Sequence, residues 1–254
     1  ILLNKKKTFI IISHGHDDHL DDFFIKNYLS DCHIIIPDLK SKGFYKRIEK
    51  LTSKKIIEIK KGFNNPFKLG TNYIYNYSND DMEHDSIFLI SNKKDLIIHA
   101  NDNYRVQPNN IIKEIKKISD KKNVYYFSQI GIANSFPICT NMTLKEKKHF
   151  IESEHKRFIK SFEKNINSVN ANLALIYANQ FNFDNIYNLS YFENVKKLIS
   201  KKSNLHQLMP GDSIFKGKLI RNKKRDLNIF EISLKNLENL LNKYIKFKIK
   251  TKIK

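Results

Sequence analysis

The chain has 254 residues, 41% of them hydrophobic and 28% charged, a composition that is typical of a globular protein and excludes a disordered one. No apolar run approaches the roughly 20 residues of a membrane-spanning helix, and we expect no signal peptide. The lysines behind the formal net charge of +20 are spread along the whole chain, so we expect a solvated basic surface and no nucleic-acid partner. Cys32 and Cys139 lack the spacing of a redox or zinc motif, which favours a cytoplasmic setting.

The first sixty residues alternate short β-branched runs with amphipathic segments. Short apolar runs of this kind are typical of buried strands, and acidic residues favour the start of a helix. The predicted strands are residues 7–12, 33–37 and 55–59. The first predicted helix begins within residues 18–22 and runs to about residue 29, and the second covers residues 40–51. Strands that alternate with helices predict an α/β sheet.

After Gly62 the sequence favours antiparallel strands, and helices then return. Residues 92–95 have the composition of a hairpin turn, and Thr143 with Glu146 has the pattern of a capping box. The remaining predicted strands are 66–70, 72–77, 87–90, 96–98, 124–127, 173–177 and 205–208, and the remaining helices are 108–118, 143–167, 190–202 and 231–246. We divide the chain into a domain of residues 1–215 and a basic, helical C-terminal extension of residues 216–254.

The densest polar cluster lies directly after the first predicted strand, in the segment Ser13-His14-Gly15-His16-Asp17-Asp18-His19. Neutral imidazole and carboxylate are ligands that zinc, iron and manganese accept. The end of a strand is a usual position for such a site, because the sheet holds it rigidly. The spacing H-x-H-x-D-H is far more specific than a single pair of histidines, so it predicts a metal site here.

Two later residues extend the pattern: His84 follows a strand-rich segment, and Asp102 follows the second arm of the predicted hairpin. Together with the first motif, they resemble the metallo-β-lactamase superfamily. The resemblance implies a four-layer αβ/βα sandwich, and the strands that precede the first motif in that superfamily are expected to be missing here. It also implies one or two divalent metal ions, with zinc expected and iron or manganese as alternatives. The implied ligands are His14, His16 and His84 for one metal, Asp18 and His19 for the second, and Asp102 for both, with Asp18 and Asp102 also holding a water molecule.

The superfamily usually supplies a further histidine to the second metal from a late strand. Asn179 and Gln180 occupy that position here, and His206 is the only later histidine in the sequence, so the second site either lacks a ligand or uses His206. Asp85 could hydrogen-bond to a ligand histidine, and His99 could orient a ligand or simply be a satisfied histidine at a strand end. Five polar residues of predicted loops could contact a polar substrate or instead satisfy backbone groups: Ser128, Gln129, Asn134, Asn179 and Gln180.

A closer resemblance is to the CMP-N-acetylneuraminate hydroxylase family, and it is carried by residues 12–20, 83–86, 97–102 and 128–137. It implies a sugar or sugar-nucleotide substrate. The Rieske iron–sulfur ligands of that family, paired C-x-H and C-x-x-H motifs, do not occur in this sequence. An oxygenase of this type would therefore need electrons from a separate Rieske or electron-transfer protein, or from a Rieske domain on a segment that precedes this sequence.

The first functional hypothesis is a metal-dependent hydrolase that uses metal-activated water on an ester, amide or phosphate-type bond. Its partner would be a small-molecule substrate such as a sugar or sugar nucleotide. The alternative is an iron-dependent oxygenase component that acts on a CMP-sialic acid-like sugar. A nucleic-acid-processing metallo-hydrolase, motivated by the charge, is the second alternative, and a metalloprotein without catalytic activity is the last.

Overall fold

The computed structural model describes residues 8–16, 19–40, 42–78, 85–103, 105–130, 141–177, 197–208, 212–215 and 217–221. Residues 1–208 form one compact unit and residues 209–254 form a second. The predicted domain boundary after residue 215 stays a prediction. Within the described ranges, no helix combines the length and the apolar character that crossing a bilayer requires.

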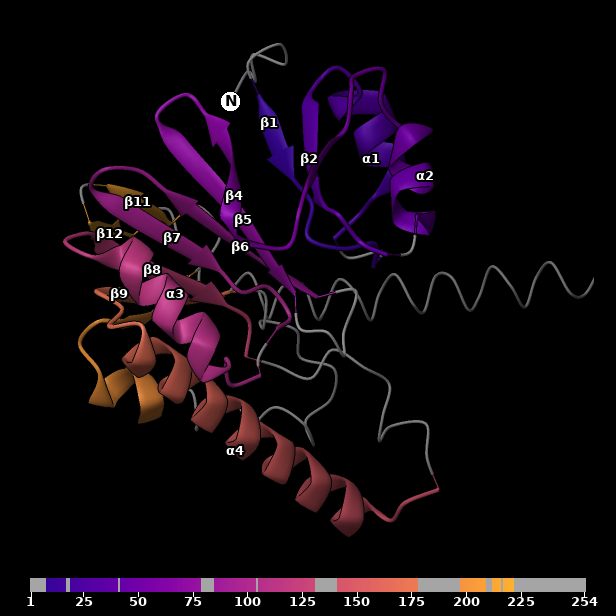
Figure 1. The fold of residues 1–254 in the computed structure, drawn as a ribbon. Helices are drawn as coiled ribbons and strands as arrows, with labels where there is room; N and C mark the ends of the chain where they lie inside the picture. Colours follow the sequence, from indigo (N-terminus) through magenta and orange to yellow (C-terminus); the bar gives the residue numbers. More distant parts are fainter. Residues whose placement is uncertain are drawn as a thin grey trace, which may run out of the picture. The chain divides into compact units, whose positions relative to one another are not determined.

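The first sheet of the larger unit is parallel, and its described strands follow the order β1-β2-β3 (Figure 1). These strands are β1 (Phe9–Ile11), β2 (His33–Pro37) and β3 (Ile57–Ile59). Between β1 and β2 lies α1 (Asp22–Phe24), which continues into the π-helical turn η2 (Ile25–Leu29), and between β2 and β3 lies α2 (Gly43–Glu49). This sheet confirms the predicted alternation of strands and helices.

The second sheet is mixed, and seven strands of the described chain form it in the order β10-β9-β8-β7-β6-β5-β4. Strands β4 to β7 pair antiparallel, whereas β7 to β10 pair parallel. Its strands are β4 (Gly62–Leu69), β5 (Asn72–Ser78), β6 (Ser86–Ser91), β7 (Asp95–His99), β8 (Asn123–Ser128), β9 (Leu173–Ile176) and β10 (Leu205–Gln207). Two helices connect the parallel strands, α3 (Asn109–Ser119) between β7 and β8 and α4 (Leu144–Ser168) between β8 and β9. The capping box that opens α4 is formed by Thr143 and Glu146 as predicted.

The layers of the fold follow from three apolar clusters. Ile34 and Ile36 of β2 pack with Ile25 and Ile48 of the helices on one face of the first sheet. Successive residues of a strand point to opposite faces, and Ile35 accordingly packs on the other face, against the second sheet. The cluster between the two sheets is Ile35, Ile59, Ile74 and Phe88.

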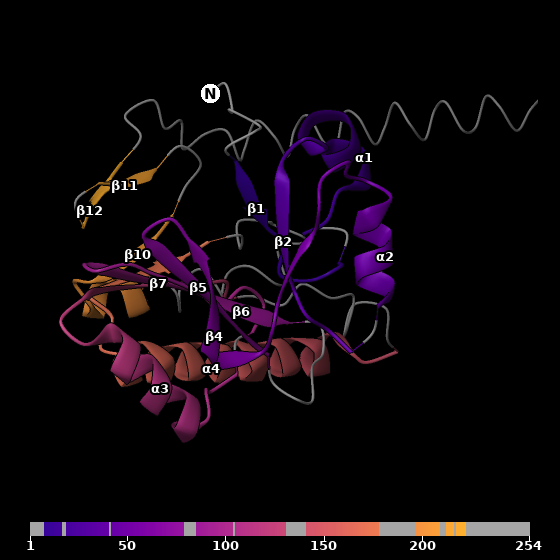
Figure 2. The same cartoon turned by 45° about the horizontal axis from the view of Figure 1, so that its top comes forward.

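The far face of the second sheet packs against α3 and α4, where Leu89, Ile98 and Tyr126 contact a cluster that includes Ile111 and Phe162. The described part of the larger unit is therefore layered as helices, sheet, sheet and helices, and Figures 1 and 2 show α1 and α2 beside the first sheet and α3 and α4 beside the second. This arrangement confirms the predicted α/β class and is consistent with a metallo-β-lactamase-like sandwich.

In the second unit, β11 (Ser213–Phe215) and β12 (Lys218–Ile220) form an antiparallel hairpin. Gly217 in its turn has a φ of 75°, a conformation that glycine adopts without steric cost. The predicted helix over residues 231–246 lies outside the described residues.

Candidate metal centre

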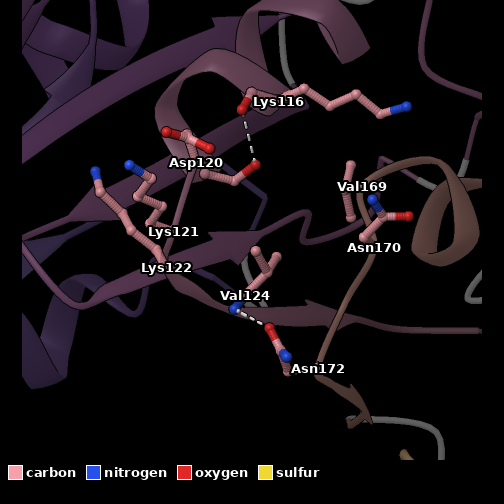
Figure 3. A pocket seen from close by; sticks show the side chains of 9 residues that line it. Lys116, Asp120, Lys121, Lys122, Val124, Val169, Asn170 and Asn172 are labelled. Atoms are coloured by element: carbon pink, nitrogen blue, oxygen red, sulfur yellow. Dashed lines mark hydrogen bonds between the residues drawn. The ribbon is translucent and has the colours of Figure 1, made fainter.

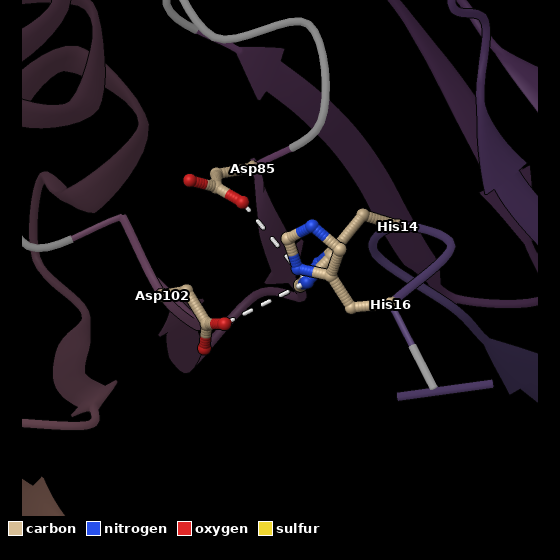
Figure 4. A group of neighbouring side chains, drawn as sticks. All are labelled: His14, His16, Asp85 and Asp102. Carbon is tan, nitrogen blue, oxygen red and sulfur yellow. Dashed lines mark ion pairs between the residues drawn. The ribbon is translucent and has the colours of Figure 1, made fainter. Parts of the chain in front are cut away.

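Four side chains from three segments converge at one end of the sheets. His14 and His16 follow β1, Asp85 directly precedes β6, and Asp102 lies just after β7. Each residue offers one ligand atom, and these atoms all lie within 4.8 Å of one another. Figure 4 shows the two histidines entering from one side and the two aspartates from the other. Two imidazoles and two carboxylates form a donor set that suits a divalent metal of the first transition row.

His14 is fully buried, and both of its ring nitrogens face defined groups. Its Nδ1 lies 2.9 Å from Ser13 Oγ, and its Nε2 lies 3.6 Å from Asp102 Oδ2 and 4.0 Å from Asp85 Oδ1. When Nε2 offers its lone pair to a metal, Nδ1 carries the proton and donates it to Ser13 Oγ, which fixes the ring orientation. The surroundings of His14 therefore fit a metal ligand that binds through Nε2.

Asp102 lies between two histidines of the first motif. Its Oδ2 is 3.3 Å from Nε2 of His19 and 3.6 Å from Nε2 of His14. Burial raises the pKa of Asp102, but the hydrogen bond and charge of His19 and the charges of His14 and His16 outweigh burial and lower it below its ordinary value. The carboxylate is therefore ionised, as a metal ligand must be.

The second oxygen of Asp102 supports the same interpretation. Oδ1 is buried, and within the described part of the chain it accepts no hydrogen bond. A buried carboxylate oxygen normally has a partner, and a metal ion or its bound water would provide one. The donor set and this oxygen together fit a divalent metal.

Asp85 is the residue that the sequence interpretation did not count among the ligands. It was expected to hydrogen-bond to a ligand histidine, whereas its carboxylate belongs to the group of four that could hold the metal. Its side chain is buried, so a bound cation would compensate its charge. The sequence feature that could have indicated Asp85 as a ligand is its position next to His84 and directly before a buried strand.

Two asparagines on either side of Asp102 connect the segments that carry the aspartates. Asn101 Nδ2 donates to the carbonyl of Ser86 at 2.9 Å, and Asn103 Nδ2 donates to the carbonyl of Asp85 at 3.1 Å. Both asparagines are buried, and Asn101 has a φ of 50°, which asparagine tolerates better than most residues. These bonds hold the backbones of Asp85 and Asp102 at a fixed separation.

A layer of aromatic rings lies beside Asn101. The ring of His99 is 5.2 Å from that of Tyr177 and 6.0 Å from that of Phe127, measured between centroids, and Tyr177 Oη donates to Asn101 Oδ1 at 3.4 Å. Burial lowers the pKa of His99 and raises the pKa of Tyr177, so both side chains are neutral near pH 7. His99 is thus a partly buried, packed histidine on β7.

The other predicted site residues have different environments. Ser128 Oγ donates to the carbonyl of Gln129 at 3.0 Å, and the amide of Gln129 donates to the carbonyl of Asn101. Both residues therefore satisfy backbone groups, which is the alternative to a contact with substrate. His206 lies on β10 and is not in the group of four that the described residues form. The remaining predicted residues lie outside the described residues: Asp18, His84, Asn134, Asn179 and Gln180.

A separate hollow of 420 Å³ lies at the end of α3 and is lined by charged residues that include Lys116, Asp120, Lys121 and Lys122 (Figure 3). It precedes β8, whereas Asp102 follows β7, and these two strands run parallel. The hollow and the four-residue group therefore lie at opposite ends of the strands, and the hollow does not lead to the metal centre.

No family model and no curated protein matches the chain. Among solved structures, the chain is similar to the metallo-beta-lactamase fold protein YhfI from Bacillus subtilis, which is 15% identical, with 79% of this chain and 73% of that chain covered at a TM-score of 0.43. The candidate centre rests on its own geometry and not on this likeness.

Proposed function

We propose that the chain is a metal-dependent hydrolase that acts on an ester, amide or phosphate-type bond of a small polar substrate. The observation that carries this proposal is the group of His14, His16, Asp85 and Asp102, whose ligand atoms lie within 4.8 Å of one another. Asp85 is buried and Asp102 is partly buried, and burying carboxylates costs free energy unless a cation compensates them. The group also lies at strand ends, where a rigid scaffold can present a reactive site.

The four residues would hold one divalent metal, and zinc suits this set of nitrogen and oxygen donors. His19, through its contact with Asp102 Oδ2, would contribute to a second position. By the resemblance, Asp18 would join His19 there, and His84 would join His14 and His16 at the first position. A metal bound here would lower the pKa of a coordinated water and polarise the substrate bond. Asp102 would orient that water, because its buried Oδ1 has lone pairs available.

The aromatic side of the site would not compete for protons. His99 and Tyr177 are both partly buried and neutral, as the directions of their pKa shifts indicate. A polar substrate such as a sugar or sugar nucleotide is the finer proposal, and it rests on the sequence motifs alone.

Metal analysis and an activity screen test the proposal together. The full chain is purified and its zinc, iron and manganese content measured, and hydrolysis of ester, amide and phosphodiester substrates is then assayed without any reductant. We expect stoichiometric metal, hydrolysis without electrons, and loss of both in His16→Ala. His149→Ala, an exposed histidine on α4, is the matched control and should retain both.

Two outcomes would overturn the proposal. Turnover that requires oxygen and an electron donor would support the iron-dependent oxygenase alternative. Metal content that is unchanged in both His16→Ala and Asp102→Asn would show that the group of four does not bind the metal.

A further inference from the structure

The segment that carries the first motif accepts hydrogen bonds from a side chain of another element, the helix α2, at two separate points. Inside the segment, the amides of His19 and Leu20 donate to the carbonyl of His16. The carbonyl of Gly15, between His14 and His16, accepts a hydrogen bond of 2.8 Å from Nη1 of Arg47 on α2. The carbonyl of Leu20, directly after His19, accepts one of 3.3 Å from Nη2 of the same side chain. One guanidinium thus joins the two ends of the metal-binding segment.

The orientation of that guanidinium is itself fixed. Arg47 Nε lies 2.9 Å from Asp22 Oδ1, at the start of α1. Arginine presents several donors in a planar fork, so three partners can be bonded at once in one geometry. A lysine at this position has a single charged nitrogen and cannot match all three partners.

A second side chain of α2, Phe44, packs against the same glycine whose carbonyl Arg47 bonds. A Cβ added to Gly15 would lie 3.0 Å from Cδ2 of Phe44, so the helix packs directly against the backbone between the two histidines. Phe44 and Arg47 are three residues apart and therefore share a helix face. Packing by Phe44 and hydrogen bonding by Arg47 restrict the segment in complementary ways.

We propose that Arg47 is a positioning residue that holds the backbone at Gly15 and Leu20, and with it His14, His16 and His19, in the shape that binds metal, an inference that rests on the proposed metal centre. Without Arg47, the carbonyls of Gly15 and Leu20 lose their donor, and the separation of His14, His16 and His19 becomes variable. The metal would then find its ligands less well ordered. Removing an interaction that orients metal ligands typically costs about 10- to 100-fold in metal affinity, and we expect a loss of that size.

Cobalt(II) binding to the full chain tests this role, because its affinity and visible spectrum report on ligand geometry and not on activity. Arg47→Ala should weaken cobalt binding about 10- to 100-fold and alter the spectrum. Arg47→Lys should recover only part of the affinity, and added guanidinium ion should restore binding to Arg47→Ala. Lys46→Ala, which removes an exposed cation from the same helix, is the matched control and should bind as the unsubstituted chain does.

Two further variants keep the outcomes distinct. Asp22→Ala removes the acceptor that orients the guanidinium and should lower the affinity in the same direction, even if Arg47→Ala fails to fold. If His16→Ala abolishes cobalt binding while the Arg47 and Asp22 variants retain the affinity and spectrum of the unsubstituted chain, the positioning role is overturned and the metal centre stands. If His16→Ala also binds cobalt normally, the metal centre is wrong.

Discussion

The side-chain amide of Asn103 donates a hydrogen bond of 3.1 Å to the backbone carbonyl of Asp85. The two residues are far apart in the sequence, and each lies beside a strand end of the second sheet. With the bond from Asn101 to Ser86, this contact sets the separation of the two candidate carboxylate ligands. The metal centre therefore depends on interactions between backbone and amide groups as well as on its ligands.

Asn103→Asp should weaken zinc binding by about 10-fold, because a carboxylate of the same shape cannot donate to the carbonyl of Asp85. The free energy of unfolding of the metal-free chain should fall by about 1–3 kcal/mol, since a buried acceptor loses its partner. Isothermal titration with zinc and urea unfolding measure the two effects. Asn110→Asp, exposed on α3, is the control, and equal zinc affinity in both variants would contradict the prediction.

Gly15→Ala should destabilise the chain by about 1–3 kcal/mol, because the new methyl group overpacks the contact with Phe44. The ring of Phe44 is the nearest neighbour, so the cost should depend on that side chain. The double variant Gly15→Ala with Phe44→Leu should recover part of the lost stability. Additive losses in the double variant would show that the ring is not the source of the strain.

The sequence predicts helices and strands well where burial of apolar side chains determines them. It predicts their bounds less well where a helix cap or an irregular strand pairing determines where the element begins. The run 33–37 was predicted and forms β2, because its isoleucines are buried on both faces. The first helix was predicted to begin within residues 18–22, and the cap decides the position inside that range: α1 begins at Asp22, since Asp21 is extended and its side chain accepts from the amide of Phe24. Strand β4 begins at Gly62, earlier than predicted, because a register irregularity after Gly62 lets an edge strand contain Pro66.

The site shows the same division. The first motif and the resemblance to the metallo-β-lactamase superfamily together predicted that His14, His16 and His19 lie close to Asp102, and the structure brings these four residues together. The position of Asp85 in the group was missed, because it depends on bonds from Asn101 and Asn103 across the sheet. Periodicity and motif spacing carry no signal for such bonds, nor for the contacts that Arg47 makes to the segment.

His155 should make the stability of the metal-free chain depend on pH. It is buried on α4 with 5% of its surface exposed, and burial lowers its pKa to about 4, although Glu152 opposes the shift. In the unfolded chain its pKa is about 6.5, so between these two values the unfolded state binds more protons than the folded state. The stability from this residue is therefore fully present above pH 6.5 and is lost as the pH falls toward 4.

Urea unfolding of the metal-free chain between pH 4 and pH 7 measures this effect. The difference in unfolding free energy between the unsubstituted chain and His155→Gln should change with pH by up to about 1.4 kcal/mol per unit inside that window. His149→Gln, on the exposed side of the same helix, should follow the unsubstituted chain. Parallel curves for all three proteins would contradict a buried, neutral His155.

Zinc should stabilise the folded chain in proportion to its binding at the centre. A ligand that binds only the folded state at 100 times its Kd adds about 2.7 kcal/mol, so chelation should lower the Tm measured by calorimetry. The effect should weaken at acidic pH, because protonated imidazoles no longer bind metal. His16→Ala should show the same Tm with zinc and with chelator, whereas His149→Ala should respond as the unsubstituted chain does. A zinc-dependent Tm that survives in His16→Ala would place the stabilising metal somewhere other than the group of His14, His16, Asp85 and Asp102.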